Sequence, residues 1–499
     1  MKIQDFTGGL SRRKRPQFLN INEAVQYRNI DSSAGTLCPV KGPKQSGLSL
    51  NQYMYYFDEE ERWLSSVLPT AYLEYQGTVY SVDGVAPKRI KGVVTAKLGI
   101  DVPASTFTGT VVPGTGGLNG TYNYFLTFYN STDGIESGPS TNNVDYVVTS
   151  PGKVTINALP VSVDPQVNKK RLYRIGGSLT APALVVELTN ATTTYDDLLA
   201  DNAIIGDLMV STTYLPAPVT LTHIAEYNAM LFGADGYTLR FTPIAVPTAW
   251  PVFYSIRYAD RVVGSCATPN GLLVFTTKQT YLVTGSRPDQ LASRLVNSTI
   301  GCVSWESIQK FGTMSVWVSS TGICASTGGE TQVITLDALG EIKFAPLSSA
   351  VIGKIYYMLD SSGITYAVDT RFGTIIKDFD FDCATLAVKG DELYGWSLNG
   401  IVILMGSTAL AKLKYTSPRF VEGASTELKS YKKIYIYSEG DIIIRCWIDN
   451  KLVATKTLTG NDTHTMSIPE EQQRGHFIQF EVEGTGEVFE IEYEVGQRT

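Results

Sequence analysis

Short apolar runs separated by turn residues are the feature that most constrains this fold. The runs at 272–275 (LLVF), 315–318 (SVWV) and 433–437 (KIYIY) are continuous or alternating in hydrophobicity and too short for typical helices. Such runs, rich in β-branched and aromatic residues, are typical of strands. Asn270-Gly271 and Asn399-Gly400 stand between strand-like runs, and glycine accepts the positive φ that tight hairpins need. The sequence therefore predicts an all-β protein.

The strand-like runs also recur. Apolar stripes at helical spacing are scarce, and only a few helices are expected, for example at 22–28 and 288–296. From residue 222 onward, groups of strands begin roughly every 35 to 45 residues, the size of a four-stranded propeller blade. Residues 66–90 look like a further blade. Strands from distant parts of the chain could close a ring without free sheet edges, which predicts a β-propeller of about five or six blades.

Two stretches have a different character. Residues 97–219 interrupt the repeats and contain the alternating run 122–129, so we expect an inserted sandwich like those of immunoglobulin or fibronectin type III domains. The strand at 486–495 alternates apolar residues with four glutamates, which predicts a second sandwich with one solvated acidic face. The predicted domains are an N-terminal arm (1–48), the first part of the propeller (49–96), the inserted sandwich (97–219), the main part of the propeller (220–415) and a C-terminal β-sandwich (416–499).

Composition excludes several classes of protein. Hydrophobic residues make up 43% of the chain and charged residues 18%, which excludes wholesale disorder. The net charge of −7 argues against a general nucleic-acid coating protein. No apolar run is long enough for a transmembrane helix, and the first residues lack the apolar core of a signal peptide. The six cysteines lie far apart, so we expect buried fillers in a chain folded in a reducing cytoplasm.

The order of several short motifs resembles that of podovirus tail nozzle proteins, also described as tail-tube-B-like or tail stabilisation proteins of short-tailed bacteriophages. The positions that carry this resemblance are Phe6-Thr7-Gly8-Gly9-Leu10, Pro16, Leu19, Glu23-Ala24, Tyr27-Arg28-Asn29-Ile30, Gly35, Leu37, Pro39, Lys41-Gly42, Asn228–Phe232, Trp250-Pro251, Leu273–Thr276, Gly285, Pro288, Gly301-Cys302-Val303-Ser304, Ser307 and Ser319-Ser320-Thr321-Gly322-Ile323. They cover the N-terminal segment and most of the candidate propeller.

This resemblance implies a structural protein of the virion tail rather than an enzyme. About six copies would form a ring below the portal and adaptor proteins, and the ring would continue the channel for DNA ejection. Proteins of this family also dock tail fibres or spikes, and they hold or form the gate that retains DNA. No cofactor is implied.

One basic run stands out near the N-terminus: Arg12, Arg13, Lys14 and Arg15. Residues 1–49 carry eight Lys and Arg against three Asp and Glu, an excess of 8 − 3 = 5 positive charges. We interpret the run as a subunit-contact arm, while contact with the DNA backbone and a plain solvated loop stay open. Deleting residues 1–20 is then expected to leave a folded subunit that fails to join the tail. A second expectation is a tight turn at 31–37 that needs positive φ at Gly35.

Metal binding is a weak alternative. His223, His464 and His476 are not near a cysteine or a second histidine at ligand spacing, so they predict no metal site. Asp378, Asp380 and Asp382 alternate in a DFDFD run that places them on one strand face. Three carboxylates could bind a hard cation, but a solvated strand face is the favoured interpretation.

A propeller could instead bind or cleave carbohydrate. A sialidase-like glycoside hydrolase needs paired carboxylates and an arginine cluster, for which the candidates are Arg240, Arg257, Arg261 and Glu306. The repeated Asp-box turn of sialidases is absent, as are nucleophile-elbow and phosphate-loop motifs. A carbohydrate- or receptor-binding module would need exposed aromatics, and the candidates are Tyr53, Tyr55, Tyr56 and Trp63. Aromatic residues in strands more often belong to a core.

Overall fold

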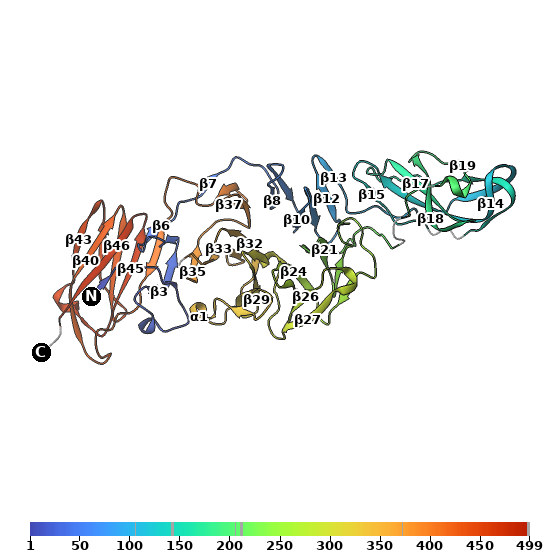
Figure 1. Ribbon diagram of the computed structural model, residues 1–499. Helices are drawn as coiled ribbons and strands as arrows, with labels where there is room; N and C mark the ends of the chain where they lie inside the picture. The colour runs from blue at the N-terminus through green and yellow to red at the C-terminus, as the bar shows by residue number, and fades with distance from the viewer. Residues whose placement is uncertain (105, 141–143, 205, 210–212, 372, 497–499) are drawn as a thin grey trace. The chain divides into compact units, whose positions relative to one another are not determined.

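Strands make up nearly all of the ordered structure in the computed structural model (Figure 1), which confirms the all-β prediction. The structure describes residues 1–499 apart from 105, 141–143, 205, 210–212, 372 and 497–499. The chain divides into two compact units. Unit 1 comprises Met1–Pro69, Cys266–Leu282 and Arg294–Thr499, and unit 2 comprises Thr70–Ser265 and Val283–Ser293.

Helical structure in the described residues is limited to single turns. They are η1 (Pro16–Phe18), η2 (Asp201–Ala203), η3 (Pro288–Gln290), η4 (Trp305–Ser307), α1 (Leu336–Leu339) and η5 (Glu470–Gln472). Both predicted helices are wrong. Residues 22–28 contain β3 (Glu23–Ala24) and β4 (Gln26–Arg28), and 288–296 contain η3 and then β27 (Ala292–Asn297). In β4 only Tyr27 is buried between two half-buried neighbours, which is the two-residue period of a strand.

Sets of four successive antiparallel strands, the size of propeller blades, recur along the chain. Unit 2 contains β10 (Ala71–Tyr75), β11 (Thr78–Val82), β12 (Lys88–Lys91) and β13 (Val94–Lys97), and also β20 (Ile224–Tyr227), β21 (Met230–Asp235), β22 (Thr238–Phe241) and β23 (Ser255–Arg257). A further set is β24 (Val262–Thr268), β25 (Gly271–Thr276), β26 (Thr280–Thr284) and β27. Unit 1 contains β28 (Gln309–Phe311), β29 (Met314–Ser319), β30 (Gly322–Ser326) and β31 (Gln332–Val333), then β32 (Pro346–Ile352), β33 (Ile355–Asp360), β34 (Thr365–Asp369) and β35 (Ile375–Phe379). The closed ring of a propeller is not detected in the described residues and stays a prediction.

A sandwich of two sheets contains the C-terminal strands, as predicted. Its strands are β39 (Leu413–Thr416), β40 (Lys429–Glu439), β41 (Ile442–Ile448), β42 (Lys451–Leu458), β43 (Asn461–Ser467), β44 (Arg474–Gly475), β45 (Ile478–Gly484) and β46 (Glu487–Gly496). One sheet has the order β1-β46-β40-β43, with β44 beside β40, and the other continues from β35 through β4-β39-β45-β41-β42. Their inner faces share one apolar core, which includes Ile434, Phe480 and Tyr493.

The N-terminal segment predicted as an arm (1–48) is built into unit 1. β1 (Lys2–Ile3) pairs with β46, β4 lies between β35 and β39, and β7 (Lys44–Gln45) completes the sheet of β36 (Thr385–Lys389), β37 (Glu392–Ser397) and β38 (Gly400–Ile403). Shorter pairs are β2 (Gly9–Leu10) with β3, and β5 (Ile30–Asp31) with β6 (Cys38–Pro39). The segment is held because its apolar side chains enter the same core: Ile3, Phe6, Leu10, Tyr27 and Leu37 are at most 1% exposed.

The turn between β5 and β6 confirms the expected conformation at Gly35. The φ of Gly35 is +84°, in the region that favours glycine, and its amide donates to the carbonyl of Ser32 at 2.9 Å. A Cβ added there would meet nothing within 4 Å. Backbone conformation rather than space therefore requires glycine at this position.

The inserted stretch forms a sheet of six strands rather than two separate sheets. The order is β18-β17-β14-β16-β19, with β15 beside β14, and the bounds are β14 (Thr108–Asn130), β15 (Ile135–Glu136), β16 (Tyr146–Asn157), β17 (Lys169–Gly176), β18 (Leu179–Thr189) and β19 (Tyr195–Asp197). The first part of β14 pairs with β16 and its last part with β17, with irregular register between Pro113 and Leu118. Residues from both parts share one apolar cluster, so one long irregular strand joins two halves around a single core.

Candidate functional site

The basic segment Arg12–Arg15 is the main site predicted from sequence, and most of it is paired within the chain. Arg12 Nη2 lies 3.2 Å from Asp378 Oδ2, Arg13 Nη1 lies 3.0 Å from Asp337 Oδ1, and Lys14 Nζ lies 3.3 Å from Glu23. Backbone amides of Arg12 and Arg13 both donate to the carbonyl of Ala338. The segment is therefore an anchored surface loop. Its role in subunit contact stays a prediction.

Asp378 shows why this loop is fixed. Its side chain is fully buried and receives ion pairs from Arg12 and from Arg28 Nε at 3.5 Å. Burial raises the pKa of Asp378, against the opposite effect of these two guanidinium groups. The prediction of a solvated face for the three alternating aspartates is therefore wrong at Asp378, whereas Asp380 and Asp382 are exposed beyond the end of β35. No cluster suited to a metal ion occurs among the described residues.

The cysteines and His223 are buried or half-buried inside the protein. All six cysteines are free thiols; four are buried, while Cys38 and Cys383 are half-buried. Burial raises the pKa of Cys302 to about 12 and lowers that of His223 to about 4. The ring of His223 accepts a hydrogen bond from the amide of Ser265 at 3.4 Å. These observations agree with the interpretation of the cysteines as core residues.

Several of the candidates for carbohydrate chemistry are engaged in packing or ion pairs, whereas two of the arginines are exposed. Trp63, in the hairpin of β8 (Tyr53–Phe57) and β9 (Arg62–Ser66), packs edge-on against Tyr56 and Tyr394, with ring centroids 5.1 and 4.9 Å apart. Tyr53 and Tyr55 are likewise half-buried. Arg240 pairs with Asp235 at 3.1 Å. Arg257 and Arg261 are exposed, and Glu306, half-buried in unit 1, has a pKa raised by burial.

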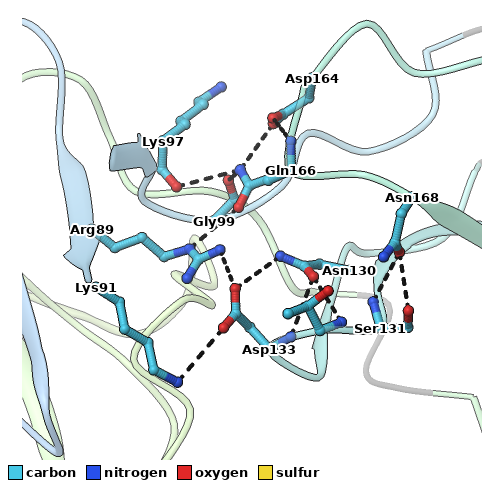
Figure 2. A network of polar contacts seen from close by, with 11 residues as sticks. Arg89, Lys91, Lys97, Gly99, Asn130, Ser131, Asp133, Asp164, Gln166 and Asn168 are labelled. Atoms are coloured by element: carbon cyan, nitrogen blue, oxygen red, sulfur yellow. Dashed lines mark hydrogen bonds and ion pairs between the residues drawn. The ribbon is translucent and has the colours of Figure 1, made fainter. Parts of the chain in front are cut away.

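A polar network at the base of the inserted sheet, which sequence analysis missed, joins β12 to the insertion (Figure 2). Arg89, on β12, is only 4% exposed. Its Nη2 donates to Asp133 Oδ2 at 2.7 Å and its Nε to Gln166 Oε1 at 3.3 Å. Lys91 Nζ lies 3.6 Å from the other oxygen of Asp133. Burial would raise the pKa of Asp133, but the bonds and charges of Arg89 and Lys91 hold it below its ordinary value.

The same network fastens the segment that leads into the insertion. The side-chain amide nitrogen of Gln166, Nε2, donates to the backbone carbonyl of Gly99 at 3.1 Å. The amide of Ala217, which follows the insertion, donates to the carbonyl of Leu98 at 2.9 Å. Entry and exit segments are thus bonded to each other and, through Gln166 and Arg89, to β12. We call Arg89, Asp133 and Gln166 the anchor triad.

The hydrogen bonds of the anchor triad hold β12 and the entry to the insertion in a fixed relative position. A guanidinium with a carboxylate and a primary amide offers charge-assisted hydrogen bonds in a fixed planar arrangement. The turn that carries Asp133 is itself held, because Asn130 Oδ1 accepts from the amides of Thr132 and Asp133. The only sequence signal was the Asp133-Gly134 turn, which predicts a hairpin but no long-range partner.

Comparison with known proteins provides no family. No protein-family model and no curated protein matches the chain. Solved structures with weak similarity include the designed protein Ika8 (10% identity, 71% of this chain and 99% of that one), PorZ of the type-IX secretion system of Porphyromonas gingivalis (12%, 81% and 45%) and BamB from Moraxella catarrhalis (12%, 72% and 98%). The TM-score is 0.29 for each, too low to support an argument about function. No helix among the described residues is long and apolar enough to cross a membrane.

Proposed function

We propose that this protein is a structural subunit of the tail nozzle of a short-tailed bacteriophage. In this role about six copies form a ring at the distal end of the tail, below the portal and adaptor proteins. The ring continues the channel for DNA ejection and provides a platform for fibres or spikes. The protein acts as part of the virion tail after synthesis in the host cytoplasm, and it needs no catalytic residues or cofactor.

The observation that carries the proposal is the physical role of the Phe6-Thr7-Gly8-Gly9-Leu10 motif. Phe6 and Leu10 are fully buried in the core of unit 1. Gly9 has a φ of +68°, and a Cβ there would lie 2.9 Å from the carbonyl oxygen of Ile376. A Cβ at Gly8 would lie 2.5 Å from the carbonyl oxygen of Asn22. The motif on which the resemblance begins is thus required by packing, which supports reading it as a framework feature and not as a chance match.

Charge also supports passage of DNA. The chain carries a net charge of −7, and a conduit of net negative charge would retain little phosphate backbone during ejection. Three residues of the strongest basic run are already occupied by carboxylates of the same chain. The proposal assigns no contact with DNA to that run.

Immunogold electron microscopy of particles from the source tests the role. An antibody against the purified chain is expected to label the tip of a short tail, and antibody preabsorbed with the chain serves as control. Absence of label on particles that contain the chain by mass spectrometry would place it elsewhere, and absence of the chain from particles would remove the structural role. In either case glycan binding and hydrolysis by the purified protein become the next measurements.

A further inference from the structure

The outer face of the sheet β1-β46-β40-β43 carries a groove lined by tyrosines and carboxylates. The groove has a volume of about 320 Å³ and is lined by Tyr435, Tyr437, Thr463, Glu490 and Glu492. The register places these residues in adjacent rows, because Tyr435 pairs with Glu492 and Tyr437 pairs with Glu490 and, across β43, with Thr463. Tyr437 is 41% exposed.

The negative charge of this face continues beyond the groove. Glu439 and Glu487 are directly opposite each other in the next row, and like charges in this position destabilise a sheet. Tyr435 donates to Glu494 at 2.6 Å, and this bond raises the pKa of the tyrosine. Lys2 Nζ lies 2.8 Å from Glu490, which also accepts a hydrogen bond from Gln4 Nε2 at 2.9 Å, and exposed Lys433 lies two positions before Tyr435 on β40. Aromatic rings beside carboxylates attract cations through both charge and the ring faces, so the face is suited to a strongly basic segment.

The chain itself carries such a segment. Arg13 and Lys14 have side chains 50% and 42% exposed. The pair of Arg13 with Asp337 is at the surface, where such pairs contribute little to stability, whereas Lys14 pairs with Glu23, whose side chain is 15% exposed. Arg15 is exposed and forms no ion pair with any described residue. Backbone bonds to Ala338 hold the loop in place, so little conformational entropy is lost when it docks.

We propose that the groove formed by Tyr435, Tyr437, Glu490 and Glu492 receives the Arg13–Arg15 loop of a second copy of this chain. The three cations of the loop would face three carboxylates along β46: Glu487, Glu490 and Glu492. Because loop and groove are different surfaces, the contact is head-to-tail, and such contacts close into rings when the rotation between copies fits. The inference rests on the proposed ring, for which it names one subunit contact.

Complementary charge reversal of the full chain is the test. The loop variant Arg13→Glu/Lys14→Glu/Arg15→Glu and the groove variant Glu490→Lys/Glu492→Lys are each expected to associate at least about tenfold more weakly than the wild type in sedimentation velocity at low ionic strength. A 1:1 mixture of the two variants is expected to recover association, since each then offers the partner of the other. Glu470→Lys/Glu471→Lys, on exposed η5, changes charge by the same amount as the groove variant and should associate like the wild type.

Carbodiimide cross-linking of mixed unlabelled and ¹⁵N-labelled chains locates the contact. Links between copies are expected to join Lys14 to Glu487, Glu490 or Glu492. A wild-type chain that stays monomeric, a groove variant that associates normally, or links that avoid Lys14 would each overturn the proposal. Binding of an unrelated oligolysine peptide to the groove without self-association would overturn it in favour of another basic partner.

Failure of this contact and failure of the nozzle role give different results. Gold label at the tail tip without a cross-link from Lys14 would support the nozzle role and refute the proposed contact. A Lys14 link with no label at the tail leaves the contact and removes the nozzle role.

Discussion

Replacing Arg89 with methionine tests whether the anchor triad fixes the insertion. The change keeps much of the length and apolar stem of the side chain but removes two hydrogen bonds, to Asp133 at 2.7 Å and to Gln166 at 3.3 Å. Breaking a fully buried ion pair costs about 3–5 kcal/mol. Asp133 is 18% exposed and still forms an ion pair with Lys91 in the variant, so the cost of losing the Arg89–Asp133 ion pair is smaller. The lost hydrogen bond to Gln166 adds about 1 kcal/mol. The expected loss is about 2–4 kcal/mol.

Hydrogen exchange is the appropriate assay, because a chain with two compact units does not guarantee a single two-state transition. A local loss of about 2–4 kcal/mol speeds amide exchange by roughly 30- to 1,000-fold. We expect this increase in residues 97–101, 130–134 and 164–168. The double variant Arg89→Met/Asp133→Asn should lose less than the sum of the single variants, because it leaves neither charge unpaired.

Lys91→Met is the matched control. Lys91 also pairs with Asp133, but at 3.6 Å and with a side chain 56% exposed. Its loss should cost under about 1 kcal/mol and change exchange less than about fivefold. Two results would refute the role given to the anchor triad. In Arg89→Met the amide exchange rates could be the same as in the wild type, or they could increase equally throughout unit 2.

Three further predictions follow from the fold. Deleting residues 1–10 removes Ile3, Phe6 and Leu10 from the core, and the burial of each contributes about 1.5–3 kcal/mol to stability. Unit 1 should therefore fail to fold, contrary to the sequence-based expectation for the 1–20 deletion. A soluble chain with native circular dichroism would contradict this, and Gln17→Ala is the surface control. Gly35→Val should lower the free energy of unfolding by about 1–2 kcal/mol through backbone strain alone, measured by denaturant titration, whereas Gly329→Val, at an open position without positive φ, should change it little. Burial lowers the pKa of His223 to about 4 in the folded chain, whereas unfolding restores the ordinary value of about 6.5. The unfolded chain therefore binds one more proton than the folded chain between these pH values, and the stability of unit 2 should fall by about 3 kcal/mol from pH 6.5 to 4. His223→Gln should remove that part of the pH dependence.

Local patterns in the sequence predict local structure well. The KIYIY run lies within β40. The turn between β37 and β38 consists of Leu398 and Asn399, and Gly400, with a φ of +112°, begins β38. Both succeed because the strand period and the φ of glycine act over a few residues. The expected helix at 22–28 fails because its seven residues are too few to separate a helical period from strand pairing with distant partners.

Long-range contacts were outside the reach of one sequence. The partners of Arg89 lie 44 and 77 positions away, and nothing in the local sequence distinguishes Arg89 from other arginines. The strand partners of the N-terminal segment could not be predicted for the same reason. Its strands are two or three residues long, so they carry no periodicity, and their place is set by apolar side chains that fit gaps in sheets formed by residues far along the chain.

The pairing of β1 with β46 has a consequence for synthesis of the protein. Lys2 is bonded into a sheet beside Glu492, so this part of the chain leaves the ribosome 492 − 2 = 490 residues before its partner in the sheet. At about 5–20 residues per second this delay is on the order of 25–100 s. During that time Phe6 and Leu10 have no core to enter and need protection from aggregation. Unit 2, whose main segment is continuous, can fold meanwhile, so the order of synthesis favours completion of the insertion before unit 1.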